Sequence, residues 1–445
     1  MTGHAARHLP IHRGPAGWAE ILGPRRPAPP LGDETTADFV IVGAGFAGLS
    51  AARRLTQLQP GARVVVLEAG ELAEGAAGRN SGFMIDLPHE LTSQDYAGAG
   101  DDRAIIALNR QAQDFAAEAV AEYGIDANFF DHAGKVNGAA SAAAHANNLS
   151  YARHLESLGE ASEMLDAQQM AELTGSRHYR SGLYTPGTVM LQPAGYIRGL
   201  GEGLRRQVRL CETSPVIGFA RQGRDWRVET DRGAVTAPRV ILTVNGHLES
   251  FGFARGRLMQ IFLFATMTAA LDADALARLG GQPRWGITPS DPMGTTMRRI
   301  DSGQGGNRIV TRSCAALRPG MAATAGDLSR AARVMRAKFD SRFPQLAGWP
   351  MEYAWAGHLC LTLNGVSVMR EVEDGVFAGC VQNGLGTARG TLTGIGAAEL
   401  ACGETSTITR HFTTEPCPKR LPPRPLAEIG ANAILRWREW RAREE

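Results

Sequence analysis

Three glycines near the beginning of the chain have the spacing of a phosphate-binding turn. Gly43, Gly45 and Gly48 stand in G-x-G-x-x-G register, directly after the β-branched and aromatic run FVIV at 39–42. In such a turn the first glycine allows a tight bend, the second admits a pyrophosphate, and the third lets the following helix pack closely on the strand. The main-chain amides at the start of that helix attract negative charge. The pattern predicts a dinucleotide site; a glycine turn that serves only packing is the alternative.

An acidic residue stands where a dinucleotide site needs one. The second apolar run, ARVVVLEAG, contains Glu68, which follows Gly48 by 20 residues. A carboxylate at this distance binds the ribose hydroxyls. Because strand, glycine turn, helix and acid occur in order, the motif is much more specific than G-x-G-x-x-G alone.

After Glu68 the chain departs from the pattern of an NAD-binding domain, which continues with another helix and strand. Residues 75–82 read GAAGRNSG, a run of small residues interrupted by Arg79, Asn80 and Ser81. Glycine-rich sequence of this kind forms a regular helix poorly. We predict a loop that lies along the bound ligand.

A third glycine-rich segment lies near the end of the chain. Asn383, Gly384 and Gly386 predict a turn, and a helix follows from about Thr387 with glycines at 390, 394 and 396. Each glycine inside a helix costs about 0.5 to 1 kcal/mol relative to alanine, so close backbone approach to a ligand or a neighbouring element must compensate. Tight packing of the helix on the sheet explains the later glycines, and explains the turn less well.

Together these motifs resemble those of the FAD-dependent D-amino-acid-oxidase-like (DAO) oxidoreductases, a family that includes glycine oxidase, sarcosine oxidase and γ-glutamylputrescine oxidase. The resemblance is strongest to the last of these branches and covers nearly the whole chain. It rests on the Trp-containing arm before the first strand, the GRNSG loop, TVNGH at 243–247, the glycine-rich run near 384 and the tail PLAEIGANAILRWREW. The glycine turn and the GRNSG loop are specific motifs, whereas the tail is only suggestive.

The resemblance implies that FAD is the dinucleotide. It implies that the helix after Thr387 points its N-terminus at the pyrimidine end of the flavin, where the helix dipole stabilises the negative charge of the reduced ring. It also implies that the main chain at Val216 contacts the adenine. The residues expected to contact FAD are Gly43, Gly45, Phe46, Ala47, Gly48, Glu68, Ala69, Ala76, Arg79, Asn80, Ser81, Gly82, Val216, Asn245, Gly246, Asn383, Gly384, Leu385, Gly386 and Thr387.

The same resemblance bears on how the flavin is attached. Sarcosine oxidases bind their flavin covalently through a cysteine in a stretch comparable to WAGHLCLTLNG, where Cys360 stands. We expect a buried structural thiol and non-covalent FAD, with Cys360 as the less favoured attachment site. The segment also departs from the family, in which Asp-x-x-Pro follows Trp-Gly. Here Asn364 to Met369 read NGVSVM, which leaves the local flavin contacts open.

The chemistry implied by the resemblance is oxidation of a C–N bond. A hydride passes to flavin N5, and the imine product is hydrolysed to a carbonyl compound and a released amine. The implied substrate is a small amine or N-substituted amino acid, or a γ-glutamyl-type polyamine conjugate, and oxygen or an electron carrier reoxidises the flavin. Two alternatives stay open: a flavin-dependent 2-hydroxy-acid dehydrogenase, and a non-catalytic flavin-binding or tRNA-modifying scaffold protein.

Several polar residues are candidates for substrate contact, and each has a structural alternative. Arg298 fits a substrate carboxylate, because a guanidinium binds it through two hydrogen bonds, or it is a solvent-facing hairpin arginine. Asp86 fits a cationic amine, or it caps the following turn. His89 fits a hydrogen bond to substrate or flavin. His247 and His358 are further candidates, with satisfied structural histidines as the alternative.

The elements that must position these residues belong to an α/β chain whose 445 residues suggest two interleaved domains. We predict a doubly wound, glutathione-reductase-like Rossmann domain that binds FAD, interleaved with a mixed-sheet α+β substrate domain. An irregular arm anchored by Trp18 precedes them. The expected bounds are 1–35 for the arm; 36–95, 191–250 and 351–405 for the FAD-binding domain; 96–190 and 251–350 for the substrate domain; and 406–445 for a tail with a helix.

The amino-acid composition indicates which kinds of binding partner and which cellular compartment to expect. The 47 basic and 45 acidic residues give a net charge of +2, and no basic cluster indicates nucleic acid or an anionic membrane. The six cysteines form no C-x-x-C pair, which argues against a disulfide scaffold or a zinc site and fits a reducing compartment. No run has the length of a signal peptide or the roughly 18 to 20 apolar residues of a membrane span. We expect a cytoplasmic enzyme without a metal; its oligomeric state stays open.

Overall fold

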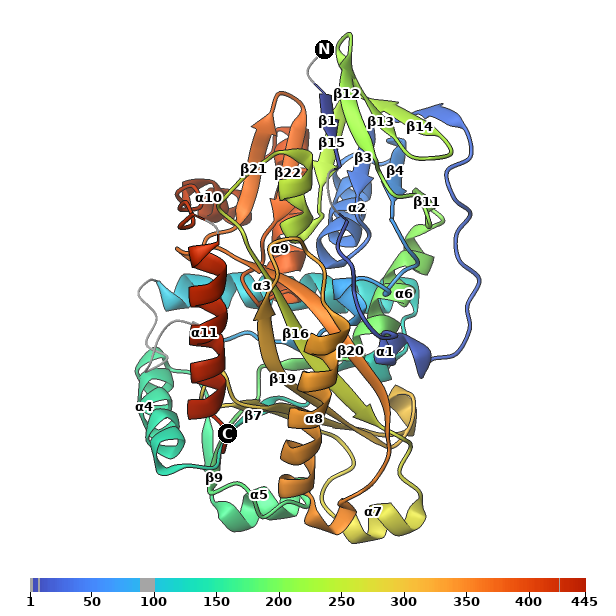
Figure 1. Ribbon diagram of the computed structural model, residues 1–445. Coiled ribbons are helices and arrows are strands. Elements are labelled where there is room, and N and C mark those ends of the chain that lie inside the picture. The colour runs from blue at the N-terminus through green and yellow to red at the C-terminus, as the bar shows by residue number, and fades with distance from the viewer. Residues whose placement is uncertain (1–2, 7–8, 89–100, 424) are drawn as a thin grey trace.

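Two large sheets organise the molecule. The computed structural model describes residues 3–6, 9–88, 101–423 and 425–445, and Figure 1 shows the path of the chain. A six-stranded sheet lies in the upper half of the view and an eight-stranded sheet in the lower half. The first contains the predicted dinucleotide-binding strands, and the second contains strands expected in the substrate domain.

The six-stranded sheet has the order β11-β4-β3-β15-β22-β21. All its neighbours are parallel except the β21–β22 hairpin. β3 and β4 are buried along their whole length, as expected of parallel strands covered on both faces. The strands are β3 (Phe39–Val42), β4 (Val64–Leu67), β11 (Arg209–Cys211), β15 (Arg239–Leu242), β21 (Val368–Glu373) and β22 (Val376–Cys380).

Helices cover one face of this sheet and a second sheet covers the other. The helices are α2 (Phe46–Leu58), α3 (Asp102–Tyr123), α6 (Pro193–Leu204) and α9 (Ala388–Cys402), which pack on one another. The covering sheet consists of β1 (Gly3–Ala5), β12 (Gly218–Gln222), β13 (Asp225–Glu229), β14 (Ala234–Ala237) and β2 (Glu34–Thr36), in that order. Its Trp226 and Val228 share a buried apolar cluster with Val40 and Val65. The predicted α/β fold is confirmed.

The eight-stranded sheet has the order β20-β16-β19-β18-β17-β7-β9-β8. Its neighbours are antiparallel except β17 and β7. Helix α8 (Ala325–Arg342) covers one face, where Met335 packs with Phe262 and Phe264. The strands are β7 (Lys135–Ala139), β8 (Glu163–Leu165), β9 (Ser181–Thr185), β16 (Met259–Thr268), β17 (Trp285–Pro289), β18 (Thr296–Ile300), β19 (Arg308–Leu317) and β20 (Met351–Leu361).

The sheets do not follow the expected domain bounds at every point. β20 lies inside the range 351–405 that we assigned to the FAD-binding domain, whereas its hydrogen bonds join it to β16 of the eight-stranded sheet. A small three-stranded sheet, in the order β5-β10-β6, combines Phe83–Met84, Val189–Leu191 and Phe130–Asp131. The chain therefore passes between the two large sheets several times, and the domain bounds stay a prediction.

A bulge interrupts β19 in the middle of its pairing with β16. Ser313 stands opposite Phe264 and Ala315 opposite Leu263, so Cys314 is the extra residue, and its φ is +67°. A bulge shifts the alternation of side chains by one residue. Arg312 and Ala315 therefore face the same side of the sheet, although three residues separate them along the chain.

Helix α11 (Leu426–Arg441) lies beside the outer half of β19 (Figure 1). β18 pairs with β19 only from Arg308 to Arg312, and α11 side chains contact the main chain beyond that point. Asn432 Oδ1 accepts a hydrogen bond from Leu317 N at 3.0 Å, and Glu439 Oε1 accepts one from Ala315 N at 2.8 Å. Arg330 of α8 pairs with Glu439 at 2.9 Å. Polar side chains thus fix the helix on the strand.

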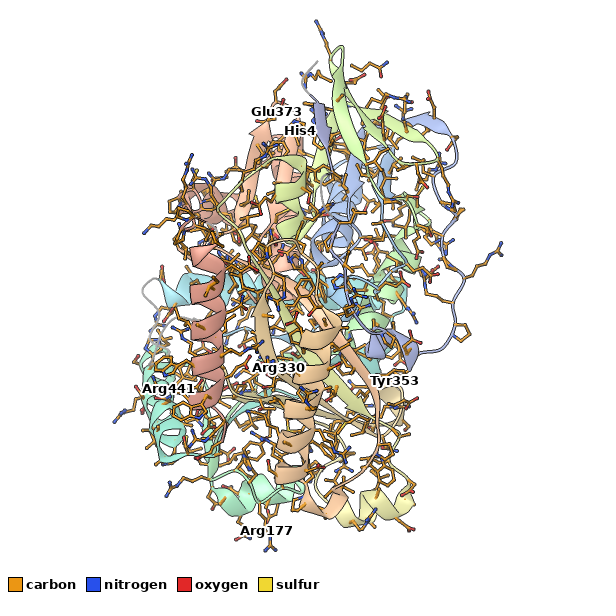
Figure 2. All side chains as sticks on the ribbon, viewed as in Figure 1. His4, Arg177, Arg330, Tyr353, Glu373 and Arg441 are labelled. Carbon is orange, nitrogen blue, oxygen red and sulfur yellow. The ribbon has the colours of Figure 1, made fainter. Side chains whose placement is uncertain are left out.

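The N-terminal arm is fastened to both halves of the molecule. In the eight-stranded sheet, Ala356 N of β20 donates a hydrogen bond to Arg13 O at 2.8 Å. Trp18 is fully buried, as expected of an anchor, and its carbonyl accepts a hydrogen bond from Gln192 Nε2 at 2.8 Å. At the top of the view in Figure 2 the His4 imidazole pairs with Glu373 at 2.7 Å. The same ring stacks on Phe219. The arm is therefore a part of the packed structure.

The remaining helices are α1 (Gly17–Glu20), α4 (Ala142–Leu158), α5 (Ala167–Thr174), α7 (Ala273–Leu279) and α10 (Thr407–Thr414). Within the described ranges no helix combines the length and apolar character needed to cross a lipid bilayer. The same residues contain no group of three His, Cys, Asp or Glu side chains that could hold a metal ion. All six cysteines are described, and each is free.

Candidate active site

A cavity of about 1140 Å³ lies between the two large sheets. The carboxyl ends of β3, β4 and β15 open into it from one side, and one face of β16, β19 and β20 forms the other side. Ligands of open α/β sheets bind outside the carboxyl ends of the strands. The cavity is therefore the place where the predicted dinucleotide and its substrate should meet.

The glycine turn borders this cavity. Gly43 has a φ of +99°, which favours glycine, and Gly45 is the extended N-cap of α2. Gly43, Gly45, Phe46 and Ala47 line the cavity, whereas Gly48 does not. A Cβ at Gly48 would lie 1.8 Å from Gly43 O, so this glycine serves the close packing of helix on strand.

Glu68 lines the cavity where the sequence predicts the ribose-binding acid. Its Oε2 accepts a hydrogen bond from Ala44 N at 2.7 Å, and its Oε1 accepts one from Gly70 N at 3.2 Å. Burial raises the pKa of the carboxyl group. A carboxylate offers about four acceptor positions, so Glu68 keeps capacity for ribose hydroxyls. The expected contacts Ala69, Ala76 and Val216 also line the cavity.

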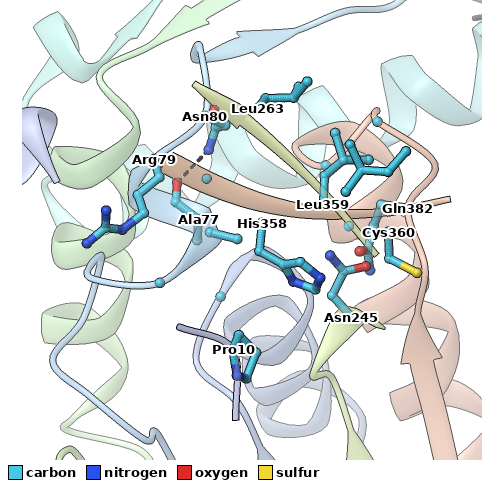
Figure 3. A pocket seen from close by; sticks show the side chains of 18 of the residues that line it. Pro10, Ala77, Arg79, Asn80, Asn245, Leu263, His358, Leu359, Cys360 and Gln382 are labelled. Atoms are coloured by element: carbon cyan, nitrogen blue, oxygen red, sulfur yellow. Dashed lines mark hydrogen bonds between the residues drawn. The ribbon is translucent and has the colours of Figure 1, made fainter. Parts of the chain in front are cut away.

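The GRNSG loop is held rigidly along the cavity (Figure 3). Asn80 Nδ2 donates to Ala77 O at 2.5 Å, and its Oδ1 accepts from Gly82 N at 2.7 Å. The Arg79 guanidinium donates to Glu74 O at 2.6 Å and to Gly14 O in the arm at 2.9 Å. The loop therefore presents one fixed surface, and Arg79 through Gly82 line the cavity; their contact with FAD stays a prediction.

Arg298 lies behind this loop and is absent from the described lining of the cavity. Its Nη1 donates to Ser81 O at 3.1 Å and to Leu191 O at 2.5 Å, and its Nη2 donates to Gln304 Oε1 at 3.3 Å. The guanidinium also lies over the Trp18 ring at 5.1 Å. Burial lowers its pKa to about 9. The structure thus places Arg298 neither at the cavity nor in solvent, but as a support of the loop.

The N-terminus of α9 forms another wall. Asn383 through Thr387 line the cavity, and Thr387 Oγ1 donates to Phe83 O at 2.7 Å. The Asn383 side chain is engaged elsewhere in the protein, because its Oδ1 accepts a hydrogen bond from Thr362 N at 2.8 Å. A Cβ at Gly394 would lie 2.1 Å from Ala47 O. The later glycines therefore serve the contact between α9 and α2, and the two helices direct their N-termini into one cavity.

The loop after β15 contributes a buried acceptor that has no partner among the described residues. Asn245 lines the cavity with a φ of +48°, and its Oδ1 has no hydrogen bond among the described residues. Gly246, an expected FAD contact, is not in the described lining; it packs closely against Gln260, where a Cβ would lie 2.2 Å from Gln260 Oε1. A buried acceptor of this kind is expected to bind a hydrogen-bond donor of a ligand. The two helix N-termini are expected to bind an anion. A flavin dinucleotide supplies both, so the residues present fit FAD.

The other substrate candidates lie in different surroundings. Asp86 is buried outside the cavity lining, and its Oδ2 pairs with Arg110 at 3.2 Å. His247 and His358 line the cavity, and His358 Nε2 lies 2.9 Å from Gln260 Oε1. Burial lowers the pKa of His358 to about 3. His89 lies outside the described residues.

Sequence reasoning missed Arg312, which lines the cavity from β19. Its Nε is buried without a hydrogen-bond partner, and the guanidinium makes no hydrogen bond or ion pair with any described residue. Burial lowers its pKa to about 10. Val310 and Ala265 flank it on the same face. The alternation of side chains along RIVTRSC is consistent with Arg312 facing the cavity. The same alternation in the preceding strand is equally consistent with Arg298 facing it, so the pattern does not choose between them.

Comparison with known protein families identifies the class of protein to which this chain belongs. Residues 38–400 match the FAD dependent oxidoreductase (DAO) family. The chain therefore belongs to this family, as the motifs implied, and is an FAD-dependent oxidoreductase.

Two relatives match most of the chain. "Probable oxidoreductase OrdL" of Haemophilus influenzae is 25% identical over 394 residues, covering 84% of this chain and 85% of its own. Gamma-glutamylputrescine oxidoreductase of Escherichia coli is 25% identical over 381 residues, with the same coverage of 84% and 85%. Both are similar along nearly their whole lengths, in line with the resemblance seen in the motifs.

Solved structures share the fold at lower identity. Glycine oxidase from Geobacillus kaustophilus has a TM-score of 0.66 at 17% identity, over 83% of this chain and 96% of its own. L-amino acid deaminase from Proteus myxofaciens has a TM-score of 0.64 at 14% identity, over 92% of this chain and 96% of its own. These similarities concern the fold alone.

Proposed function

We propose that the protein oxidises the C–N bond of an amine that carries a carboxylate, such as an amino acid or an N-substituted amino acid. The observation that carries the proposal is Arg312, an inward cation of the cavity without a partner among the described residues. The names of similar proteins, a gamma-glutamylputrescine oxidoreductase, a glycine oxidase and an L-amino acid deaminase, support an amine or amino acid as the substrate.

Arg312 is suited to hold a carboxylate in one orientation. Arg312 is half-buried, and its buried Nε has no hydrogen-bond partner among the described residues. A polar group left in this state is costly, and a carboxylate satisfies a guanidinium through two parallel hydrogen bonds. Arg312 stands on a strand that is paired on both sides, opposite Ala265 and Thr296. The position of its main chain is therefore fixed. A carboxylate bound there places the neighbouring C–N bond at a constant position in the cavity, and positioning of this kind lowers the barrier of the reaction.

We further propose that FAD is held without a covalent bond. Bound FAD supplies the two-electron oxidant; Glu68, the GRNSG loop and the N-termini of α2 and α9 would hold it. The Cys360 thiol is buried, and burial raises its pKa well above the ordinary value, which suppresses the reactive thiolate. Acid denaturation of the purified protein should release all of the yellow chromophore. A chromophore that stays with the precipitate would show a covalent link.

The test of the carboxylate site compares Arg312→Met with wild type. Each protein is mixed anaerobically with an amino acid and with the amine formed by its decarboxylation, and the bleaching of the flavin is followed. We expect the concentration needed for half-maximal bleaching by the amino acid to rise about 100-fold in the variant, because two charge-assisted hydrogen bonds are lost. The response to the decarboxylated amine should stay the same.

The same panel contains the outcomes that contradict the proposal. Equal bleaching of Arg312→Met and wild type by the amino acid would remove Arg312 from carboxylate binding. Bleaching by 2-hydroxy acids and not by amines would establish the dehydrogenase alternative, since Arg312 can bind either carboxylate. Working without oxygen keeps the oxidation of substrate separate from reoxidation by oxygen or an electron carrier.

A further inference from the structure

Beyond Arg312 the cavity continues along the large sheet as far as helix α11. Its wall there is a continuous apolar cluster to which three strands and the helix contribute. We call this part the α11 compartment. Its members are Met259, Ile261, Leu263, Met293, Ala315, Leu317, Leu359, Leu361, Ala431 and Leu435, and Ile434 of α11 also lines the cavity.

The register of the sheet gives the compartment its direction and length. On the cavity face of β19, Arg312 is followed by Ala315 and then Leu317, with the bulge at Cys314 between the first two. Four regular strand residues span about 13 Å at roughly 3.3 Å each. An apolar track of this length therefore leads from the Arg312 guanidinium toward α11.

Charge in the cavity is distributed unevenly. The carboxylates of the described lining, Glu68, Glu71 and Glu74, all belong to the dinucleotide end. The charged lining residue contributed by α11 is Arg438, an exposed cation that makes no side-chain hydrogen bond or ion pair with the described residues. A distal ammonium group on the substrate would find no counter-charge there and would lose its hydration. The compartment favours an apolar group instead.

We propose that the substrate carries a large apolar substituent that fills the α11 compartment while its carboxylate binds Arg312. This inference rests on the proposed function, since Arg312 sets the near end of the substrate. Ligand cavities with apolar walls and a few convergent polar groups bind amphiphilic small molecules. Apolar walls that a ligand covers also lose their contact with water, which stabilises the complex.

The compartment is preformed, because polar contacts and not only packing hold its outer wall. Asn432 and Glu439 bind the main chain of β19 on either side of Leu435. Leu435 therefore faces Leu317 and Ile261 in the apolar cluster. A fixed wall means that an apolar substituent gains contact without ordering the helix first.

The first experiment uses the FAD-loaded protein and unreactive straight-chain carboxylates from acetate to octanoate. Dissociation constants are measured by calorimetry and by perturbation of the flavin spectrum. We expect the dissociation constant to fall about fourfold for each added methylene until the compartment is full. Turnover should follow the same order: norleucine should exceed alanine, and lysine, which adds an ammonium to the same butyl chain, should fall far below norleucine.

A matched pair of variants on α11 tests the location. Ile434→Asp places a charge in the lining, whereas Ile429→Asp places one outside the described lining on the same helix; the two side chains are 54% and 68% exposed. We expect Ile434→Asp to abolish the chain-length dependence while acetate binding stays the same, and Ile429→Asp to behave as wild type. Leu435→Ala should weaken octanoate binding and leave acetate binding unchanged.

The outcomes separate this inference from the proposed function. Acetate binding that depends on Arg312 but shows no gain with chain length would overturn the α11 compartment alone. Equal effects of Ile434→Asp and Ile429→Asp would overturn it as well. Failure of every carboxylate to bind, together with unchanged amine oxidation in Arg312→Met, would overturn the carboxylate site and with it this inference.

Discussion

Two arginines on neighbouring strands show how partners decide the role of a residue. Arg298 donates to the main chain of Ser81 and Leu191 and supports the GRNSG loop, whereas Arg312 has no partner among the described residues and faces the cavity. Burial lowers the pKa of both guanidinium groups, to about 9 and about 10. Burial alone therefore does not distinguish a structural cation from a ligand-binding one.

His358, which is buried, and His12, which is half-buried, predict a loss of stability in mild acid. Burial lowers the pKa of His12 and of His358 to about 3, and the Arg79 guanidinium beside His12 adds to the effect there; the ordinary value is about 6.5. Below pH 6.5 both histidines become protonated in the unfolded chain, whereas they stay neutral in the folded chain. Stability is therefore full above pH 6.5 and falls as the pH decreases toward 3, by up to about 1.4 kcal/mol per pH unit for each histidine.

The measurement is urea unfolding at pH 7 and pH 5. His12→Gln should lose less stability between these two pH values than wild type, because one proton-binding group is gone from the unfolded chain. His132→Gln, at an exposed histidine, is the control and should match wild type. An identical pH dependence in all three proteins would show that His12 is protonated normally in the folded state.

At the residue scale the sequence was informative where the chemistry is local. The glycine turn, Glu68 and the GRNSG loop were predicted because each motif is contiguous and its spacing has a physical reason. Arg312 was missed because its role depends on which strand faces the cavity and on a bulge at Cys314. Nothing within a few residues of Arg312 or Arg298 distinguishes their surroundings.

At the scale of elements, the packing of α2 against α9 is the contact that aims two helix N-termini at one cavity. Both begin directly after a glycine-rich turn, and Gly394 allows them to touch through the backbone. Each helix was predictable from its own sequence. Their contact was not, because α2 ends at Leu58 and α9 begins only at Ala388, and no local pattern reports so distant a partner; the same holds for α11 on β19.

Gly394→Ala should separate the two helices. A Cβ at Gly394 would lie 2.1 Å from the Ala47 carbonyl oxygen, which is backbone and cannot move aside. We expect destabilisation of about 1 to 3 kcal/mol from overpacking, together with weaker retention of FAD. Thermal unfolding and the ratio of flavin to protein absorbance after dialysis measure the two effects.

Gly396→Ala in the same helix is the matched control. Its Cβ would lie 3.0 Å from the flexible end of the Met369 side chain, and alanine favours the helix. This variant should keep its FAD and unfold close to the wild-type temperature. If Gly394→Ala behaved in the same way, the contact between α2 and α9 would not control the cavity.

At the scale of the whole molecule, the N-terminal arm holds distant parts together. Arg25 pairs with Glu212, a fully buried carboxylate at the end of β11, which also accepts from the main chain at Ala28 and Leu72. Farther toward its start, Leu9, Pro10 and His12 of the arm line the cavity. The arm therefore joins the rim of the parallel sheet to the ligand site.

Arg25→Met should loosen this connection. Among the described residues, the buried Glu212 carboxylate would then keep two main-chain donors, those of Ala28 and Leu72. Removal of one partner of a buried ion pair costs about 3 kcal/mol or more. We expect a lower unfolding temperature and faster cleavage of the arm by thermolysin, which does not require the replaced arginine, measured on the FAD-loaded protein. Arg26→Met, at the exposed neighbouring position, should leave both unchanged. Equal behaviour of the two variants would assign the arm no role in stability.

The position of α11 on β19 has a consequence for the solubility of the protein. A strand edge with free N–H and C=O groups is a template for pairing with a strand of another molecule. Beyond Arg312 the edge of β19 is no longer paired with β18, and Asn432 and Glu439 occupy the main-chain groups of Leu317 and Ala315 there. Without α11 the molecule would expose an open strand edge beside an apolar wall, the combination that promotes aggregation. The helix that shapes the ligand compartment thus also protects the sheet from growing into a neighbouring molecule.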